Sequence, residues 1–288
     1  MGRALSVTVI LIALSTALGA CGSDDGSSQA STAASTGAQQ AELQHIHGLG
    51  VDPGSGSLYV ATHTGLFQAA RDDAQLERMG DSRQDIMGFS VVGPGRFVGS
   101  GHPAPSQNLP PNLGLIESRN GGRSWENISL LGKADFHVLR SAGATVYGVD
   151  GGSHLMVSRD GGRKWKSRTP PAAIFDLAVD PGDAERIVIS TERGVFSSPN
   201  VGKEWRPLRK DLAGLLAWPA PGRLYLVDGQ GQVSRSADSG REFEAVGDIG
   251  GPPAAFIGER DALHVALTDG NVKRSADGGA TWMLRATP

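Results

Sequence analysis

The sequence has little cysteine, little net charge and no persistent helical pattern, and each of these features excludes certain folds or functions. Cys21 is the single cysteine, so the chain forms no intramolecular disulfide bond. The 27 basic and 30 acidic residues are interspersed and give a formal charge of −3. Without a basic stripe, binding to nucleic acid or directly to anionic lipid is not expected. Glycine is abundant at 41 residues, which predicts many short strands and tight turns.

A long apolar run is confined to the N-terminus and is typical of an export signal. Arg3 precedes the stretch "ALSVTVILIALSTALGA" over residues 4–20. The sequence "LGAC" at 18–21 resembles the bacterial lipobox, and this resemblance implies that Cys21 is lipidated and becomes the mature N-terminus. A soluble secreted protein cleaved near Ala20 and an uncleaved signal anchor are the two alternatives.

Three segments follow from this interpretation. We expect a lipoprotein signal peptide at 1–20, lipidated Cys21 with a flexible tether over 21–44, and a folded domain over 45–288. The tether consists of small and polar residues until Leu43, so it buries too little apolar surface to fold. Its root-mean-square span of about 25–30 Å for about 23 residues predicts a domain held near, but not on, the outer side of the cell membrane.

An internal repeat predicts the architecture of the folded domain. Five segments share the pattern Ser-x-Asp/Asn-x-Gly-x-x-aromatic: "SRNGGRSW" (118–125), "SRDGGRKW" (158–165), "SPNVGKEW" (198–205), "SADSGREF" (236–243) and "SADGGATW" (275–282). They recur every 38 to 40 residues, and each follows three short strand patterns. Four strands in a period of about 40 residues predict the blade of a β-propeller.

A degenerate first copy, "HIHGLGVD" with "SLYVATHTG", raises the count to six blades. We place them at about 45–84, 85–131, 132–170, 171–211, 212–250 and 251–288, with seven blades as the alternative. The prediction is therefore an all-β, six-bladed propeller of four-stranded antiparallel blades.

The repeated segment resembles the BNR or Asp-box repeat of sialidases and other propellers. The resemblance implies that an Asp or Asn side chain accepts backbone N–H bonds across the hairpin between the third and fourth strands, while an aromatic ring covers the blade edge. The residues in these two roles are Asn120, Asp160, Asn200, Asp238 and Asp277, and Trp125, Trp165, Trp205, Phe243 and Trp282. Such a turn staples a hairpin and carries no chemistry of its own.

Most histidines fall at one end of the predicted blades. In an antiparallel blade, the first strand begins where the second strand ends. This rule places six of the seven histidines at the same end: His45, His47, His63, His102, His137 and His154. His264 lies inside a second strand and is expected to be structural. Asp85, Met87 and Asp135 also fall at the histidine-bearing end.

These residues predict either a shared ligand or metal site, or separate structural histidines. Imidazoles with the thioether of Met87 would suit copper, and imidazoles with carboxylates would suit zinc. Against convergence, His47 aligns with Phe175 and would pack between blades, and His137 aligns with Gly48 and would point to the other side of its strand. The loop over 101–114 carries four prolines and is either a rigid lid, a partner-binding edge or a tolerated insertion.

The sequence does not favour sialidase chemistry. Tyr59, Tyr147 and Tyr225 share one strand position, which indicates packing, so none is expected to be a nucleophile. The early Phe/Tyr-Arg-Ile-Pro motif of sialidases is also absent. Other glycosidases need two carboxylates. The weak candidates for that role, expected at the histidine-bearing end, are Asp85, Asp176 and Glu192.

The segments "HIHGL", "ATHTGLF", "MGF", "SGHP" and "LGLIES" resemble bacterial BNR-repeat lipoproteins that are catalogued as glycosyl hydrolases, a sialidase-like group. A weaker likeness is to propeller assembly factors of photosynthetic complexes, which bind proteins. We therefore expect a monomeric, lipid-anchored, extracytoplasmic protein. We expect it to bind a protein partner or a glycan, and to be a binding protein more than an enzyme. A glycoside hydrolase and a copper- or zinc-binding protein remain alternatives.

Overall fold

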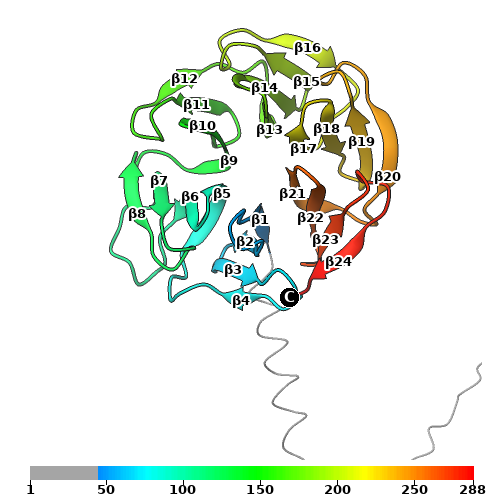
Figure 1. Cartoon of the computed structure of the whole chain (residues 1–288). Helices are drawn as coiled ribbons and strands as arrows, with labels where there is room; N and C mark the ends of the chain where they lie inside the picture. The colour runs from blue at the N-terminus through cyan, green and yellow to red at the C-terminus, as the bar shows by residue number, and fades with distance from the viewer. Residues whose placement is uncertain (1–44) are drawn as a thin grey trace, which may run out of the picture.

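The computed structural model describes residues 45–288, which form a six-bladed β-propeller (Figure 1). Each blade is a sheet of four consecutive antiparallel strands, as the sequence predicted. The predicted signal peptide, Cys21 and the tether lie outside the described residues. In the described part of the chain, no helix has the length and apolar character that a membrane crossing would require.

Residues 46 to 168 form the first three blades. Blade 1 contains β1 (Ile46–Val51), β2 (Leu58–Thr62), β3 (Gly65–Ala69) and β4 (Glu77–Arg78). Blade 2 contains β5 (Asp85–Gly93), β6 (Arg96–His102), β7 (Leu115–Ser118) and β8 (Glu126–Ser129). Blade 3 contains β9 (Phe136–Ala142), β10 (Thr145–Asp150), β11 (His154–Ser158) and β12 (Lys166–Arg168).

Residues 174 to 286 form the other three. Blade 4 contains β13 (Ile174–Asp180), β14 (Asp183–Thr191), β15 (Gly194–Ser198) and β16 (Arg206–Arg209). Blade 5 contains β17 (Leu215–Ala220), β18 (Arg223–Val227), β19 (Gln232–Ser236) and β20 (Glu244–Asp248). Blade 6 contains β21 (Pro253–Glu259), β22 (Ala262–Leu267), β23 (Val272–Ser275) and β24 (Met283–Ala286).

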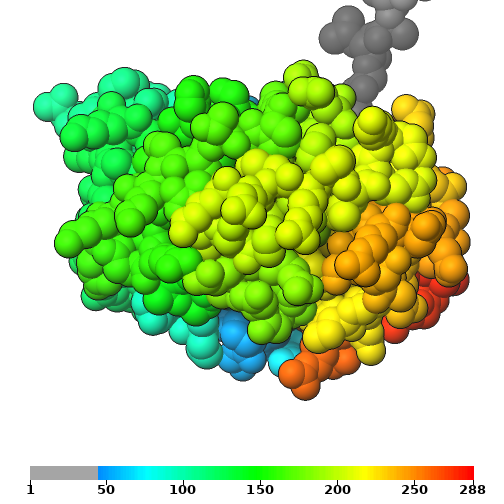
Figure 2. Space-filling model, turned by 90° about the horizontal axis from the view of Figure 1, so that it is seen from above, coloured from blue at the N-terminus to red at the C-terminus, as the bar shows by residue number. Residues whose placement is uncertain are grey.

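The first strand of each blade lines the central axis and the fourth lies at the rim (Figure 1). Turned by 90°, the molecule shows blades 3 to 5 side by side along the rim (Figure 2). Second strands such as β2 and β22 are buried along their whole length, because neighbouring blades cover both faces. Near the axis the strands need small residues: a Cβ on Gly48 would lie 2.9 Å from the Cβ of Phe89 in the next blade.

The ring closes without exchanging a strand between its ends, because blade 1 and blade 6 are each built from contiguous chain. A shared apolar cluster joins them, with Leu49 and Phe67 from blade 1 and Ala266 and Val272 from blade 6. At the rim, the Arg285 guanidinium donates hydrogen bonds to the carbonyl oxygens of Asp73 (2.6 Å) and Ala70 (2.7 Å). The seam therefore depends on side-chain packing and on a few hydrogen bonds.

The five repeated turns make the contacts expected of them. In each, the first serine accepts a hydrogen bond from the glycine N–H four residues later, at 2.7–2.8 Å. The Asp or Asn Oδ1 accepts the backbone N–H four residues on, at 2.9–3.0 Å. The aromatic residue of each turn packs half-buried against a blade core. We call the end of the disc that carries these turns the turn face, and the opposite end the mouth face.

Candidate metal centre on the mouth face

A repeated irregularity aims one residue toward the axis in five of the six inner strands. The antiparallel pairing of β1 with β2 shifts between Ile46 and Gly48, so His47 is an extra, bulged residue. The same shift occurs in β5, β9, β13 and β21. The bulged residues are His47, Met87, His137, Phe175 and Ala254. All five line one axial cavity of about 180 Å³, together with Leu215 of blade 5.

This register corrects the sequence alignment of one histidine. His137 was expected opposite to His47 on its strand, aligned with Gly48. Instead, Phe136 pairs with Asp150 as Ile46 pairs with Thr62, so His137 occupies the position of His47 two blades away. Three consecutive blades therefore present an imidazole, a thioether and an imidazole to the same cavity.

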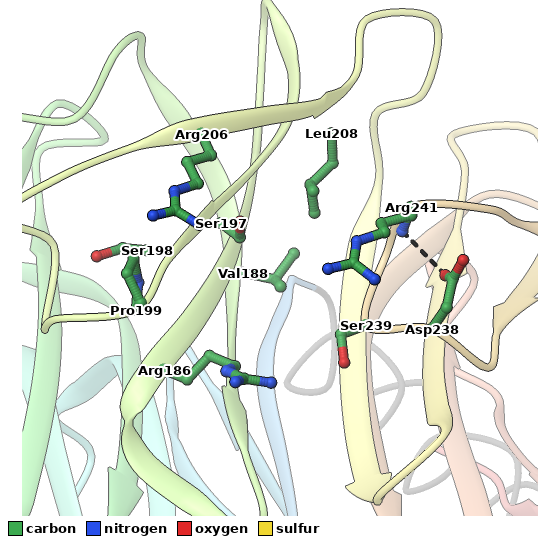
Figure 3. A pocket seen from close by; sticks show the side chains of 10 residues that line it. All are labelled: Arg186, Val188, Ser197, Ser198, Pro199, Arg206, Leu208, Asp238, Ser239 and Arg241. Carbon is green, nitrogen blue, oxygen red and sulfur yellow. Dashed lines mark hydrogen bonds between the residues drawn. The ribbon is translucent and has the colours of Figure 1, made fainter.

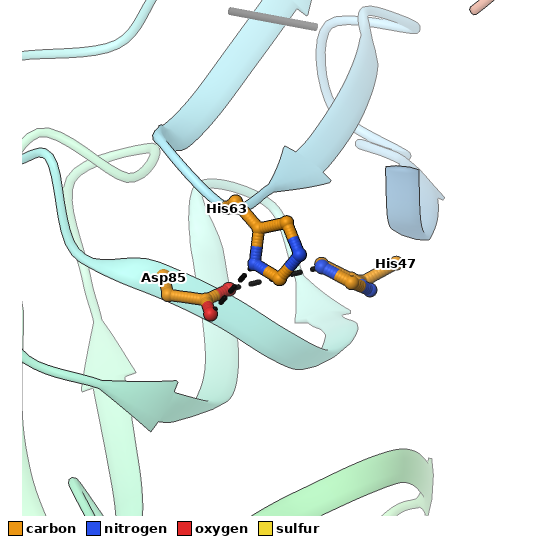
Figure 4. Close-up of side chains that lie close together, drawn as sticks. All are labelled: His47, His63 and Asp85. Carbon is orange, nitrogen blue, oxygen red and sulfur yellow. Dashed lines mark hydrogen bonds and ion pairs between the residues drawn. The ribbon is translucent and has the colours of Figure 1, made fainter. Parts of the chain in front are cut away.

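His47, His63 and Asp85 form a compact cluster across the interface between blades 1 and 2 (Figure 4). One potential ligand atom from each lies within 4.8 Å of the others. His63 Nδ1 lies 2.7 Å from Asp85 Oδ2, and His47 Nε2 lies 3.8 Å from Asp85 Oδ1. The two imidazole rings meet edge to face, with centroids 4.3 Å apart. A proton on His63 Nδ1, held by the carboxylate, leaves Nε2 with its lone pair.

The same contact recurs one blade further on. His63 and His102 each come directly after the residue that pairs with the isoleucine before the bulge, which is Thr62 for Ile46 and Gly101 for Ile86. Asp85 and Asp135 each lie two residues before the bulged residue. His102 Nε2 lies 3.4 Å from Asp135 Oδ2, as His63 lies against Asp85. His137 Nε2 also contacts Asp135 Oδ2, at 2.9 Å. The histidine set therefore divides into two neighbouring His–Asp clusters related by one blade repeat.

Buried polar atoms in both clusters lack partners. His47 Nε2, Asp85 Oδ1 and Asp135 Oδ1 are buried and make no hydrogen bond in the described chain. Burial, followed by the neighbouring His63, lowers the pKa of His47 to about 4, so this imidazole is neutral and offers a lone pair at neutral pH. An unpaired buried polar atom costs about 1–3 kcal/mol. Two such atoms facing each other indicate a site built for a further ligand.

The second cluster is more strongly self-paired. Burial opposes ionisation of Asp135, but the hydrogen bond and charge of His137 hold its carboxyl pKa below the usual value. The same hydrogen bond raises the pKa of His137. This cluster is therefore largely satisfied as an ion pair, and the His47 cluster is the better candidate for a metal centre.

The loop over 101–114 folds back and orients His102. Pro111 O accepts a hydrogen bond from His102 Nδ1 at 2.9 Å, and Leu113 N donates to Gly101 O at 2.8 Å. Gly101 adopts a φ of +141°, and a Cβ there would lie 2.2 Å from Asp85 O, so only glycine brings the loop this close to Asp85. The loop thus positions a histidine at the mouth.

The remaining candidates separate. His45, with a left-handed φ of +64°, places its ring centroid 5.1 Å from that of His63 at the edge of the cluster. His154 is exposed, and the buried His264 lies within β22. Glu192 is exposed at the end of β14.

Asp176 is a structural residue rather than a free carboxylate. Its buried side chain accepts hydrogen bonds from Arg140 Nη2 (2.7 Å), Leu177 N (2.8 Å) and Leu216 N (2.9 Å). Burial raises the pKa of its carboxyl, with Arg140 acting in the opposite direction. Asp176 thus ties blades 3, 4 and 5 together.

Arg140 and Leu215 are among the cavity residues that sequence reasoning did not single out. Both belong to first strands that read as ordinary packing, and no motif marks them. Leu215 lies one position before Leu216 on β17. This place in the blade repeat could have identified it from the sequence.

Neither protein-family models nor curated protein sequences match the chain. Solved propellers are similar in fold. A GH74 xyloglucanase from Xanthomonas campestris has a TM-score of 0.56 at 17% identity over 84% of this chain and 45% of its own. YCF48 bound to a D1 peptide has a TM-score of 0.53 at 15% identity, covering 84% and 82%. A nidogen/laminin complex chain has 0.64 at 13%, covering 81% and 93%. These identities show the fold alone, and the chain spans under half of that xyloglucanase.

Proposed function

We propose that this propeller binds a transition-metal ion of the zinc or copper class between His47, His63 and Asp85. The carrying observation is the pair of buried, unpartnered atoms His47 Nε2 and Asp85 Oδ1, 3.8 Å apart. Two ligands that each lie about 2.1 Å from one ion are at most about 4 Å apart, so a single ion can join these atoms. A bound ion would replace the missing hydrogen bonds of both.

The donor set selects the class of metal. Two imidazoles and a carboxylate suit Zn²⁺ and Cu²⁺, whereas Mg²⁺ and Ca²⁺ prefer oxygen ligands throughout. Three protein ligands leave a coordination position for water or for a ligand arriving from the mouth. His45, exposed beside His63, is placed to complete the set. On the cavity side, the thioether of Met87 adds a softer donor that would favour copper in its reduced state.

We further propose the setting in which this site works. The export signal and the lipobox-like sequence at Cys21 support a monomeric BNR-repeat lipoprotein anchored outside the cytoplasmic membrane. Binding of a protein or glycan at the mouth remains a second candidate, because Phe175 is 50% exposed on the same cavity as His47. Hydrolysis is less well supported, since Asp176 is committed to packing and Glu192 lies apart.

Metal content tests the proposal directly. The chain lacking residues 1–21, purified without an affinity histidine tag, would be dialysed after exposure to Zn²⁺ or Cu²⁺, and the bound metal counted. We expect about one ion per chain, and at least a tenfold loss of affinity in His47→Ala and in Asp85→Asn. His154→Ala is the matched control, because it removes an exposed imidazole outside the cluster. Unchanged binding in both cluster variants, or none in the wild type, would refute the site.

A further inference from the structure

A second cavity lies on the turn face between blades 4 and 5, away from the histidines (Figure 3). It has a volume of about 300 Å³. Three guanidinium groups border it: Arg186 at the start of the second strand of blade 4, Arg206 at the start of its fourth strand, and Arg241 in the repeated turn of blade 5. Val188 and Leu208 supply an apolar wall, and serine hydroxyls lie at its edge.

The positive charge of this cavity is poorly neutralised. Within residues 45–288, the guanidinium groups of Arg206 and Arg241 make no hydrogen bond or ion pair. Arg186 has one loose partner, Asp180 Oδ2 at 3.4 Å. Asp238 is the one carboxylate in the cavity lining, and its Oδ1 accepts the backbone N–H groups of Arg241 and Glu242. Three guanidinium groups therefore face a single carboxylate across the cavity.

Blade 2 shows how the same position is neutralised elsewhere in the molecule. Arg96 lies two residues before Val98 on the second strand of blade 2, and Arg186 lies two residues before Val188 on the second strand of blade 4. The register pairs Val98 with Glu117 in blade 2, and Val188 with Ser197 in blade 4. Glu117 bonds Arg96 Nη2 at 2.7 Å and Arg119 Nε at 2.9 Å. Ser197 replaces this acid in blade 4, so the cavity keeps its charge.

One local feature sets Arg241 apart from the other turn arginines. In the turns of blades 2 and 3, Arg123 and Arg163 fold back to donate to the carbonyl of their own Asn or Asp, at 3.1 and 2.8 Å. Arg241 holds the equivalent position but extends over the cavity (Figure 3). Its guanidinium group is therefore available to a ligand in the cavity.

We propose that this cavity binds a small organic oxyanion, a carboxylate, sulfate or phosphate ester about the size of one sugar residue. Guanidinium forks match such oxyanions with two hydrogen bonds each, and this geometry is better provided by arginine than by lysine. The hydroxyl groups of Ser197 and Ser239 add donors, and Val188 and Leu208 cover the carbon skeleton. The site is independent of the metal centre, because it lies on the other face and shares none of its residues.

Calorimetric titration tests the site with glucuronate, with inorganic sulfate, and with glucose as the neutral probe of the same size as glucuronate. We expect glucuronate or sulfate to bind at low salt and glucose not to bind. Ser197→Glu installs the acid that blade 2 carries at the same register, and it should weaken binding at least tenfold. If the first variant folds poorly, Arg206→Gln tests the same site, because it alters an exposed side chain. This variant should weaken binding to a similar extent.

Arg123→Gln removes the equivalent turn arginine of blade 2 and serves as the control, with affinity unchanged. Binding of sulfate without glucuronate would still support an oxyanion site and restrict its ligands to tetrahedral anions. Equal binding of glucose and glucuronate, affinity unchanged in Ser197→Glu and Arg206→Gln, or no binding of either anion would overturn the proposal. Zinc and copper binding, measured in the same variants, should be unaffected.

Discussion

Replacing Asp176 tests whether this carboxylate holds the ring together. Its side chain accepts three hydrogen bonds, one from Arg140 on blade 3, one from its own strand, and one from Leu216 on blade 5. Asp176→Ala removes both acceptor oxygens while the three donors stay in place. Two backbone N–H groups would then be buried without partners, and the Arg140 guanidinium, three-quarters buried, would lose its counter-charge.

The expected cost follows from these contacts. Removing one member of a buried ion pair typically costs about 3–5 kcal/mol, and each orphaned buried donor about 1–3 kcal/mol, with the contributions not additive. We therefore expect Asp176→Ala to lower the free energy of unfolding by about 4 kcal/mol. Asp176→Asn keeps one acceptor oxygen but turns an amide NH₂ toward a donor, so about 2 kcal/mol is expected.

Urea unfolding followed by tryptophan fluorescence measures the change through the transition midpoint at constant slope. Glu192→Gln is the control, because its exposed side chain makes no hydrogen bond within residues 45–288, and it should change stability by less than about 0.5 kcal/mol. If Asp176→Ala unfolds within about 1 kcal/mol of the wild type, the assignment of Asp176 as the tie between blades is wrong.

Three further substitutions probe the fold. Burial, with Arg274 and Arg285 nearby, lowers the pKa of His264 from 6.5 to about 4. The folded protein therefore favours the neutral ring. As the pH drops from 6.5 to 4, this residue should lower the free energy of unfolding by about 3 kcal/mol. His264→Leu should flatten that part of the pH–stability curve, and an unchanged slope would contradict the shift. Ser158→Ala removes three hydrogen bonds of one repeated turn and should cost about 1–2 kcal/mol in urea unfolding. Arg285→Ala should raise amide hydrogen exchange at the seam between blades 6 and 1 but not in blade 3; uniform exchange would count against a local seam.

The number of blades could be read from the sequence because each repeated turn is local. Ser158, Asp160, Gly162 and Trp165 interact within eight residues, so their spacing carries the structural information without knowledge of distant contacts. Four strands per repeat and antiparallel order then follow from chain connectivity. The fold prediction is confirmed for these reasons.

The sequence allowed a prediction of which end of the blades carries the candidate site, but not of which side chains meet there. Counting alternate residues along a strand assumes a regular ladder, and the bulge at His137 shifts the side-chain phase by one residue. Contacts between blades, such as His63 with Asp85, depend on the packing distance between sheets, which no local pattern encodes. The difference between Asp85, which faces unpartnered atoms, and Asp176, which is fully bonded, was invisible for the same reason.

Because blades 1 and 6 share no strand, the same ring can form from a chain that begins at another blade. Within residues 45–288, each blade is a complete stretch of sequence, and no strand passes from one end of the ring to the other. Cutting the chain between any two blades and joining Pro288 to residue 45 by a short linker should therefore give the same disc. For protein engineering, a fusion partner could then be attached beside any chosen blade, including one far from His47.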